Sequence, residues 1–279
     1  METGGNRRSG KDDRGKNKGK KRMENEEEEI SEEEMPRNII FMENEKNSKG
    51  KRVKVSEEGN DCPSSWDWRN YKGVISNVLQ QHHHFICWAI SFIRAVEALY
   101  NIGQRVDEQR SYLVNNVKVG KLGLEDRKTL GDFVQKNGLL DEAECSYKRA
   151  KGTCAHENPN IERIDRLAII NQVDDADLAR LVWRHPVVGV LPMWPDFDEH
   201  REGIYRPRER AGINQLHAVL IVGFGVDNNG SYYWIIQNSA GRGWGEGGFG
   251  LIHREHRRGR PSLFVEVFYP EKRGYPRKK

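Results

Sequence analysis

Three residues far apart in the sequence carry the side chains that a nucleophilic thiol site needs. Cys87 begins an apolar run without Gly or Pro, so its thiol lies at the first turn of a predicted helix. Unpaired N–H groups and the helix dipole favour an anion there and lower the pKa of a thiol. His217 heads a second apolar run and supplies an imidazole that can take up the thiol proton. Asn238 follows a third run, and its amide could hold the imidazole in one tautomer.

Each of these residues alone has a plainer interpretation. A cysteine before an apolar helix is more often an inert core residue. A single histidine at the start of a strand is usually structural, and an asparagine before a Gly-rich turn is common. The combination of thiol, imidazole and amide favours covalent catalysis by a thiolate.

The elements that must position these residues follow from apolar periodicity and from Gly and Pro stops. Helices are predicted over 87–102, 107–119, 126–137 and 174–184. Short β-branched or aromatic runs predict strands at 187–191, 217–224, 232–237, 249–253 and 263–268. A helical half followed by an antiparallel β half predicts an α+β protein with two packed lobes and a cleft between them.

Charge is concentrated at the start of the chain. Charged residues make up 32% of the 279 residues, and residues 1–61 alone hold 15 Lys and Arg with 16 Asp and Glu. We expect 1–61 to be a disordered charged tail, since such runs cannot bury enough apolar surface to offset the entropy of ordering. Its basic blocks around 16–22 and 49–54 could bind an import receptor or another anionic partner, although a solvated tail is the simpler expectation. A short basic tail is expected at 273–279.

The overall composition excludes several classes of protein. The net charge is only +4, so nucleic-acid binding through bulk charge is not expected. No run approaches the ~20 apolar residues of a transmembrane helix, and Met1 is not followed by an apolar leader. We therefore expect no membrane association and a cytoplasmic or nuclear location.

The cysteines and histidines do not predict a metal site. The four cysteines, at 62, 87, 145 and 154, contain no C-x-x-C pair and are too few for a disulfide scaffold, which favours a reducing compartment. Cys145 and Cys154 could pair in an oxidising one. His82, His83 and His84 are consecutive, so their side chains point in different directions, and no cysteine or carboxylate cluster joins them. We expect neither a metal nor an organic cofactor.

Several motifs in combination resemble the mature catalytic domain of papain-family cysteine proteases. The matching segments are Pro63 to Arg69, Gln81 followed by Cys87-Trp88-Ala89, Glu97, Leu216 to Val219, Val222 to Gly225, Gln237 to Ser239 and Gly243 to Phe249. The order Cys, His, Asn also fits the family, in which the His and Asn follow ~130–150 residues after the nucleophile. The resemblance implies a two-lobe fold over 62–272, with a helical lobe at about 62–170 and a β-barrel-like lobe at about 171–272.

The resemblance also implies a role for particular residues. Cys87 would be the nucleophile, His217 its acid and base, Asn238 the orienting amide, and Gln81 the side-chain donor of an oxyanion hole. The implied substrate is a peptide or protein, bound by the positions Gly123, Val190, Ala218 and Trp244. Val190 and Ala218 would favour an apolar side chain next to the residue at the cleaved bond.

The sequence departs from the family pattern at three places near the cleft. His84 and the region 120–125 lack the usual paired half-cystines, and the latter also lacks a Gly-Gly pair, for which Gly123 could substitute. Ala240 stands where the family has a tryptophan that covers the Asn–His hydrogen bond, so slower turnover is expected. The charged tail has no pattern of the family's helical propeptide.

These departures keep two further hypotheses open. One is a protease-derived, non-catalytic binding protein that recognises partners through its cleft or tail. The other is acyl transfer to a different acceptor, such as peptide ligation, which the same three residues would support. The intact set of Gln81, Cys87, His217 and Asn238 favours the peptidase.

Overall fold

The computed structural model describes residues 62–81, 86–102, 112–113, 127–141, 161–207, 215–255, 259 and 261–274. The expected N-terminal tail, most of the expected C-terminal tail, the three consecutive histidines, Gly123 and the possible Cys145–Cys154 pair lie outside these residues. In the part that is described, no helix is both long enough and apolar enough to cross a membrane.

Helix α1 (Cys87–Asn101) forms the centre of the molecule, and the predicted helix over 87–102 is confirmed. Every residue from Trp88 to Asn101 is buried, because apolar side chains surround the helix axis. Two charged side chains share this interior: Arg94 and Glu97 are 3% and 0% exposed and form an ion pair of 2.6 Å between Nη1 and Oε2. The pairing compensates charges that would otherwise be costly to bury.

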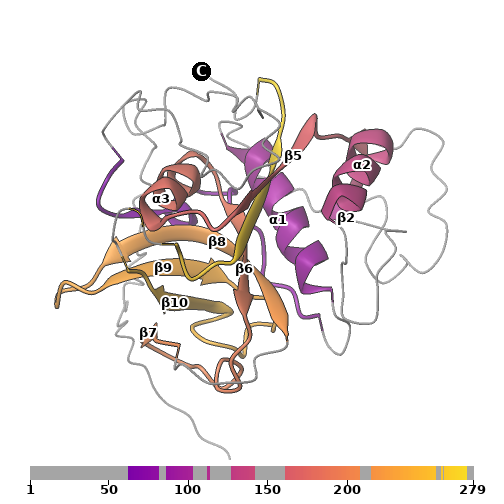
Figure 1. The fold of residues 1–279 in the computed structure, drawn as a ribbon. Helices are drawn as coiled ribbons and strands as arrows, with labels where there is room; N and C mark the ends of the chain where they lie inside the picture. The colour runs from indigo at the N-terminus through magenta and orange to yellow at the C-terminus, as the bar shows by residue number, and fades with distance from the viewer. Residues whose placement is uncertain are drawn as a thin grey trace, which may run out of the picture.

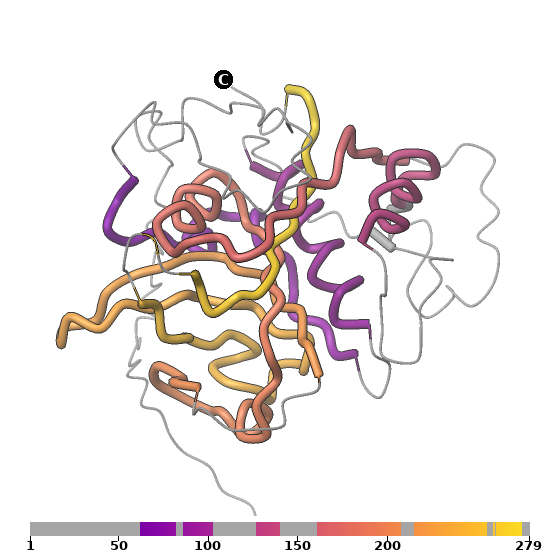
Figure 2. The backbone as a smooth tube through the Cα atoms, in the orientation of Figure 1, coloured from indigo at the N-terminus to yellow at the C-terminus, as the bar shows by residue number. Residues whose placement is uncertain are grey.

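One large sheet packs against α1. Its strands follow the order β5 (Arg166–Asn171), β11 (Glu266–Glu271), β6 (Val187–Pro192), β8 (Leu216–Val226), β9 (Tyr232–Gln237), β10 (Phe249–His253) and β7 (Ile204–Tyr205), and β1 (Trp66–Asp67) also pairs with β8. Figure 1 shows β11 and β6 running through the middle of the molecule beside α1, and Figure 2 traces the same path through the backbone. All pairs in this sheet are antiparallel except β10 with β7.

The remaining elements lie around this sheet. Helix α3 (Asp175–Arg184) covers part of it, and its N-terminus is capped by Asp174, whose carboxylate accepts from two backbone N–H groups. Helix α2 (Arg127–Asn137) lies beyond α1 in Figure 1. A second sheet is made of β2 (Tyr112–Leu113), β3 (Leu139–Asp141) and β4 (Ile161–Glu162), and a 3-10 helix, η1, covers Trp68–Asn70.

Strand β8 separates two parts of the core, because its successive side chains point to opposite faces. Ala218, Leu220 and Val222 pack in the cluster that includes α1, whereas Val219 and Ile221 pack in the cluster that includes α3. Alternation therefore places the side chain of His217 on the face opposite that of Ala218.

Most predicted elements are confirmed, with two corrections. Three of the four predicted helices are present, and the strands expected at 187–191, 217–224, 232–237 and 249–253 lie within a residue or two of their positions. The predicted helix over 107–119 is wrong at Tyr112–Leu113, which pair with β3, so tertiary pairing overrides local propensity there. The last strand begins at Glu266 rather than at 263, and the predicted lobe boundary near 170 falls within β5.

Candidate active site

Cys87 and His217 lie together where the first turn of α1 meets the start of β8. Their side chains are hydrogen-bonded, and the backbone N–H groups of Ala218 and Trp88 also donate to the Cys87 sulfur. Ser91, one turn further along α1, donates from its hydroxyl to the carbonyl of Ala218 at 3.1 Å. The helix and the strand are thus joined at two points next to the thiol.

The electrostatics of this contact favour a charged pair. Burial alone raises the pKa of the Cys87 thiol, but the hydrogen bond and positive charge of His217, together with the backbone hydrogen bonds of Ala218 and Trp88, outweigh burial, so the pKa lies below its ordinary value. For His217, burial lowers the pKa, yet the bond and charge of Cys87, with smaller contributions from Asn238 and the carboxylate of Asp198, raise it overall. Both shifts stabilise a thiolate facing an imidazolium.

Asn238 fixes the orientation of the imidazole. Strands β8 and β9 are adjacent, so the residue after β9 reaches the start of β8. Nε2 of His217 lies 2.7 Å from Oδ1 of Asn238. A carbonyl oxygen can only accept, so Nε2 carries the proton, which leaves Nδ1 for Cys87. The same Oδ1 accepts from the backbone N–H of Ser239 at 2.8 Å, and the N–H of Asn238 donates to the carbonyl of Gly248 at 2.9 Å.

Gln81 belongs to a segment that is fastened along the Asn238 turn. The N–H of Gln81 donates to the carbonyl of Ser239 at 2.8 Å, and the N–H of Gly241 donates to Leu79 at 3.1 Å. The side chain of Gln237 donates to the carbonyl of Ser76 at 2.7 Å. The side-chain oxygen of Gln81 is buried, and within the described residues it accepts no hydrogen bond.

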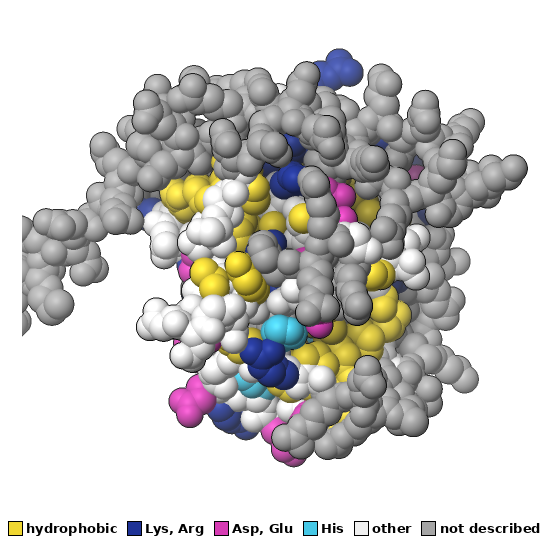
Figure 3. Space-filling view, turned by 60° about the vertical axis from the view of Figure 1, so that its left-hand side comes forward, with side chains coloured by type: hydrophobic (Ala, Val, Ile, Leu, Met, Phe, Trp, Pro, Cys, Tyr) yellow, Lys and Arg dark blue, Asp and Glu magenta, His cyan; other side chains and the backbone are white. Residues whose placement is uncertain are grey.

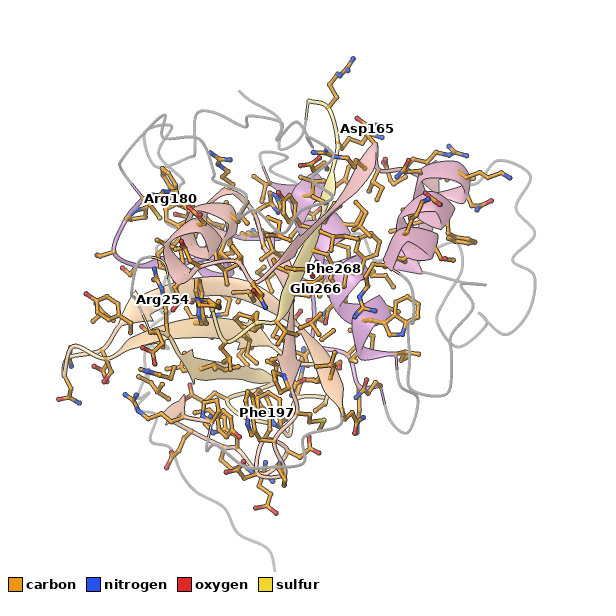
Figure 4. The ribbon with its side chains drawn as sticks, viewed as in Figure 1. Asp165, Arg180, Phe197, Arg254, Glu266 and Phe268 are labelled. Atoms are coloured by element: carbon orange, nitrogen blue, oxygen red, sulfur yellow. The ribbon has the colours of Figure 1, made fainter. Side chains whose placement is uncertain are left out.

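An aromatic cluster supports the imidazole on the α3 side of β8. The rings of Phe197 and His217 are 5.9 Å apart in an edge contact, and Phe197 lies 5.1 Å from the ring of Trp244. Trp244 is only 4% exposed, and its Nε1 donates to the carbonyl of Phe197 at 2.9 Å. Figure 4 shows Phe197 at the end of the sheet near β7, on a loop that follows β6. The sequence analysis missed Phe197, because nothing in its spacing distinguishes it from an ordinary core residue.

The predicted substrate-binding residues that the structure describes lie in two different parts of the core. Val190 and Ala218 face each other across β6 and β8 and belong to the core cluster of α1, so they lie on the Cys87 side of β8. Trp244 lies in the buried aromatic cluster instead. Ala240 forms a bridge with Gln80 and packs at the edge of the same cluster as Trp244.

A separate cavity lies away from the thiol. It has a volume of about 450 Å³ and lies between the segment of β1 and η1 and strands β8 to β10. Arg69 lines it, held by Asp67 at 2.7 Å and lying 5.1 Å from the centre of the Phe249 ring. Neither Cys87 nor His217 lines this cavity, so the contacts between reactive groups, and not the cavity, define the candidate site.

Among the side chains that the structure describes, no group of three or more His, Cys, Asp or Glu residues could hold a metal ion.

Comparisons with known proteins show the family to which this chain belongs. Residues 62–263 match the sequence profile described as "Papain family cysteine protease". Ananain of Ananas comosus is 31% identical over 197 residues, which cover 69% of this chain and 56% of ananain. A probable cysteine protease of Arabidopsis thaliana is 32% identical over 250 residues, which cover 86% of this chain and 66% of that protein. The chain thus spans a little over half to two thirds of the length of these relatives.

Solved structures have the same fold. The bromelain protease from Ananas comosus, solved in complex with an inhibitor, has a TM-score of 0.61 and 26% identity over 75% of this chain and 99% of that one. Digestive procathepsin L2 from the larval midgut of Tenebrio molitor has a TM-score of 0.63 and 29% identity over 75% of this chain and 68% of that one. The α+β, two-lobe fold expected from the sequence is therefore confirmed, and this chain belongs to the papain family of cysteine proteases.

Proposed function

We propose that this chain hydrolyses peptide bonds through a thioester formed on Cys87. The observation that carries this proposal is the hydrogen bond between Cys87 and His217, in a setting that lowers the pKa of the thiol and raises that of the imidazole. Membership of the papain family supports a peptide or protein as the substrate.

In the acylation step, the Cys87 thiolate attacks the carbonyl carbon of the peptide bond and a C–S bond forms. The proton on Nδ1 of His217 passes to the peptide nitrogen, the C–N bond breaks and the amine leaves. In the second step, His217 takes a proton from water, the resulting hydroxide equivalent attacks the thioester, and the C–S bond breaks. The acid product leaves, and the thiolate and imidazolium are restored. Asn238 accepts from Nε2 throughout and keeps Nδ1 directed at the reacting atoms.

Negative charge develops on the carbonyl oxygen in both steps. The backbone N–H of Cys87 and the side-chain amide of Gln81 are the proposed donors to this oxygen. Support comes from the Gln81 segment, whose backbone is fixed to Ser239 beside the Asn238 turn.

The acyl side of the substrate is proposed to bind near Val190 and Ala218. Both are apolar, and Ala218 donates its N–H to the Cys87 sulfur, so this pair lies directly beside the nucleophile. An apolar side chain one residue before the cleaved position would fit there.

The experiment compares the wild-type chain with Cys87→Ala and, as a matched control, Cys62→Ala. A thiol-directed epoxide and a fluorogenic peptide with an apolar residue at the second position before the cleaved bond are the two probes. We expect labelling and hydrolysis in the wild type and in Cys62→Ala, and neither in Cys87→Ala. Equal, negligible labelling and turnover in all three proteins would reject the peptidase and favour a binding protein. Adding an amine acceptor distinguishes hydrolysis from peptide ligation, because ligation gives the amide product.

A further inference from the structure

Asp198 lies beside the catalytic imidazole, on the side of β8 away from Val190 and Ala218. It follows Phe197, whose ring contacts His217, on the loop between β6 and β7. Phe197 points inward and is fully buried, whereas Asp198 is exposed. The negative charge of Asp198 contributes to the raised pKa of that imidazole, although less than Cys87 and Asn238 do. The carboxylate is therefore open to solvent, and it is one residue away from the ring that contacts the imidazole.

Within the described residues, no contact occupies the carboxylate of Asp198. The backbone carbonyl of Asp198 accepts a hydrogen bond from Nη1 of Arg201 at 3.3 Å, and Arg201 also binds the carbonyl of His200 at 3.1 Å. Across the described residues, no ion pair or hydrogen bond engages the Asp198 side chain itself. By contrast, Asp196 two residues earlier accepts from the hydroxyl of Tyr205 at 2.7 Å.

The reaction chemistry indicates which part of the substrate meets this carboxylate. His217 gives its proton to the leaving amine, so the residue that follows the cleaved bond must pass next to His217. The acyl part is held by Cys87 on the Val190 and Ala218 side. Because side chains alternate along β8, the departing part lies on the opposite side, where Phe197 and Asp198 are.

We propose that Asp198 selects a lysine or arginine immediately after the cleaved bond. This inference rests on the proposed peptidase function and specifies its substrate class. An ammonium or guanidinium group there would meet an unoccupied carboxylate, whereas an acidic residue would be repelled by it.

Other charged side chains lie on the same loop as Asp198. Glu199 and Glu202 are exposed on the same loop and add to the negative potential, while Arg201 opposes it. From the neighbouring turn, Glu246 acts on His200. Figure 3 shows acidic and basic side chains interspersed on one face of the molecule, so a general surface charge of one sign is not visible there. The selection is thus assigned to Asp198 individually.

The test uses two quenched fluorescent peptides that differ only in the residue after the cleaved bond, which is arginine in one and glutamate in the other. Mass spectrometry verifies the cleavage position. We expect kcat/KM to be about three- to tenfold higher for the arginine peptide at low salt, in the range of an exposed charge interaction that changes sign. At about 1 M salt the preference falls towards one, because the Debye length is then about 3 Å.

Variants assign the effect to one residue. Asp198→Asn brings the ratio of the two kcat/KM values to about one, and Asp198→Lys reverses it. Glu202→Gln is the matched control, since it removes one charge from an exposed residue of the same loop, and it lowers the ratio much less than Asp198→Asn does. Equal cleavage of both peptides by the wild type, or an unchanged ratio in Asp198→Asn, overturns this inference while the peptidase function stands. If neither peptide is cleaved, the result contradicts the proposed peptidase function itself, and the inference about Asp198 is contradicted with it.

Discussion

The backbone N–H of Gln81 donates to the carbonyl of Ser239 at 2.8 Å, which ties the segment before α1 to the residue after Asn238. Two groups of the proposed mechanism are therefore mechanically linked. The amide that would bind the oxyanion and the amide that orients His217 lie on paired segments, although they are far apart in the sequence. A change in either segment is expected to affect both groups.

Replacing Gln81 by Ala removes the proposed side-chain donor to the oxyanion. We expect kcat to fall by about 10²–10³-fold, corresponding to about 2.7–4 kcal/mol of transition-state stabilisation, with little change in KM. Steady-state kinetics on the fluorogenic peptide measure both constants.

Gln80→Ala is the control for this variant. Gln80 is exposed and precedes Gln81 in the same bridged segment, so its truncation changes the segment without removing the proposed donor. A loss of kcat in Gln80→Ala as large as that in Gln81→Ala would show that the segment, and not the Gln81 amide, accounts for the effect.

Gly248→Ala should disturb the turn that holds Asn238. Gly248 has a φ of +95°, and an added Cβ would lie 2.5 Å from Cγ1 of Val78. Its carbonyl accepts from Asn238, so relief of the clash would shift the orienting amide. We expect the free energy of unfolding to fall by about 1–3 kcal/mol from overpacking, beyond any backbone strain, and kcat to fall as well.

A variant of the neighbouring glycine distinguishes the effect of backbone strain from the effect of the steric clash with Val78. Gly247 also has a positive φ, +65°, but an added Cβ would meet nothing within 4 Å. Gly247→Ala should thus cost only the left-handed backbone strain of about 1–2 kcal/mol. Chemical denaturation of both variants tests this, and equal losses of stability would contradict the role given to the contact with Val78.

His185 should make the fold sensitive to acid. Burial lowers the pKa of this residue to about 4, and its Nδ1 donates to the carbonyl of Pro186 at 3.0 Å. The unfolded chain takes up a proton at this position near pH 6.5, whereas the folded chain does so only near pH 4. The unfolded state binds more protons in between, so stability is lost as the pH falls from about 6.5 to about 4, by about 3 kcal/mol from this residue.

Urea denaturation across this pH range measures the effect. His185→Gln removes the titrating group, so its free energy of unfolding should decline less steeply between pH 6.5 and pH 4 than that of the wild type. Parallel pH curves for the two proteins would exclude His185 as the source.

Local patterns predicted the elements that carry the reactive groups. The apolar run after Cys87 indicated a buried helix, and the run after His217 indicated a buried strand, because each pattern depends on neighbouring residues only. The adjacency of β8 and β9 followed from the short connection between them, which brought Asn238 next to His217.

The rest depended on contacts that no local pattern encodes. Phe197 supports His217 from a loop, and Asp198 is close to the ring only because that loop folds back after β6. Strand β5 pairs with β11, which lies about a hundred residues later in the chain. The pattern of the six residues of β5 does not by itself distinguish a strand from one face of a helix. Such long-range pairing is decided by the assembled core.

The central claim, a thiolate on Cys87 facing an imidazolium on His217, is tested most directly by the pH dependence of alkylation. Iodoacetamide labelling followed by peptide mass mapping gives a rate for each cysteine, and Cys62 serves as an internal reference because burial raises the pKa of its thiol. We predict that at pH 6 Cys87 reacts on the order of tenfold or more faster than Cys62, since its pKa is lowered. A Cys87 rate that follows the pH profile of free cysteine, or that does not exceed the rate of Cys62, would contradict the account.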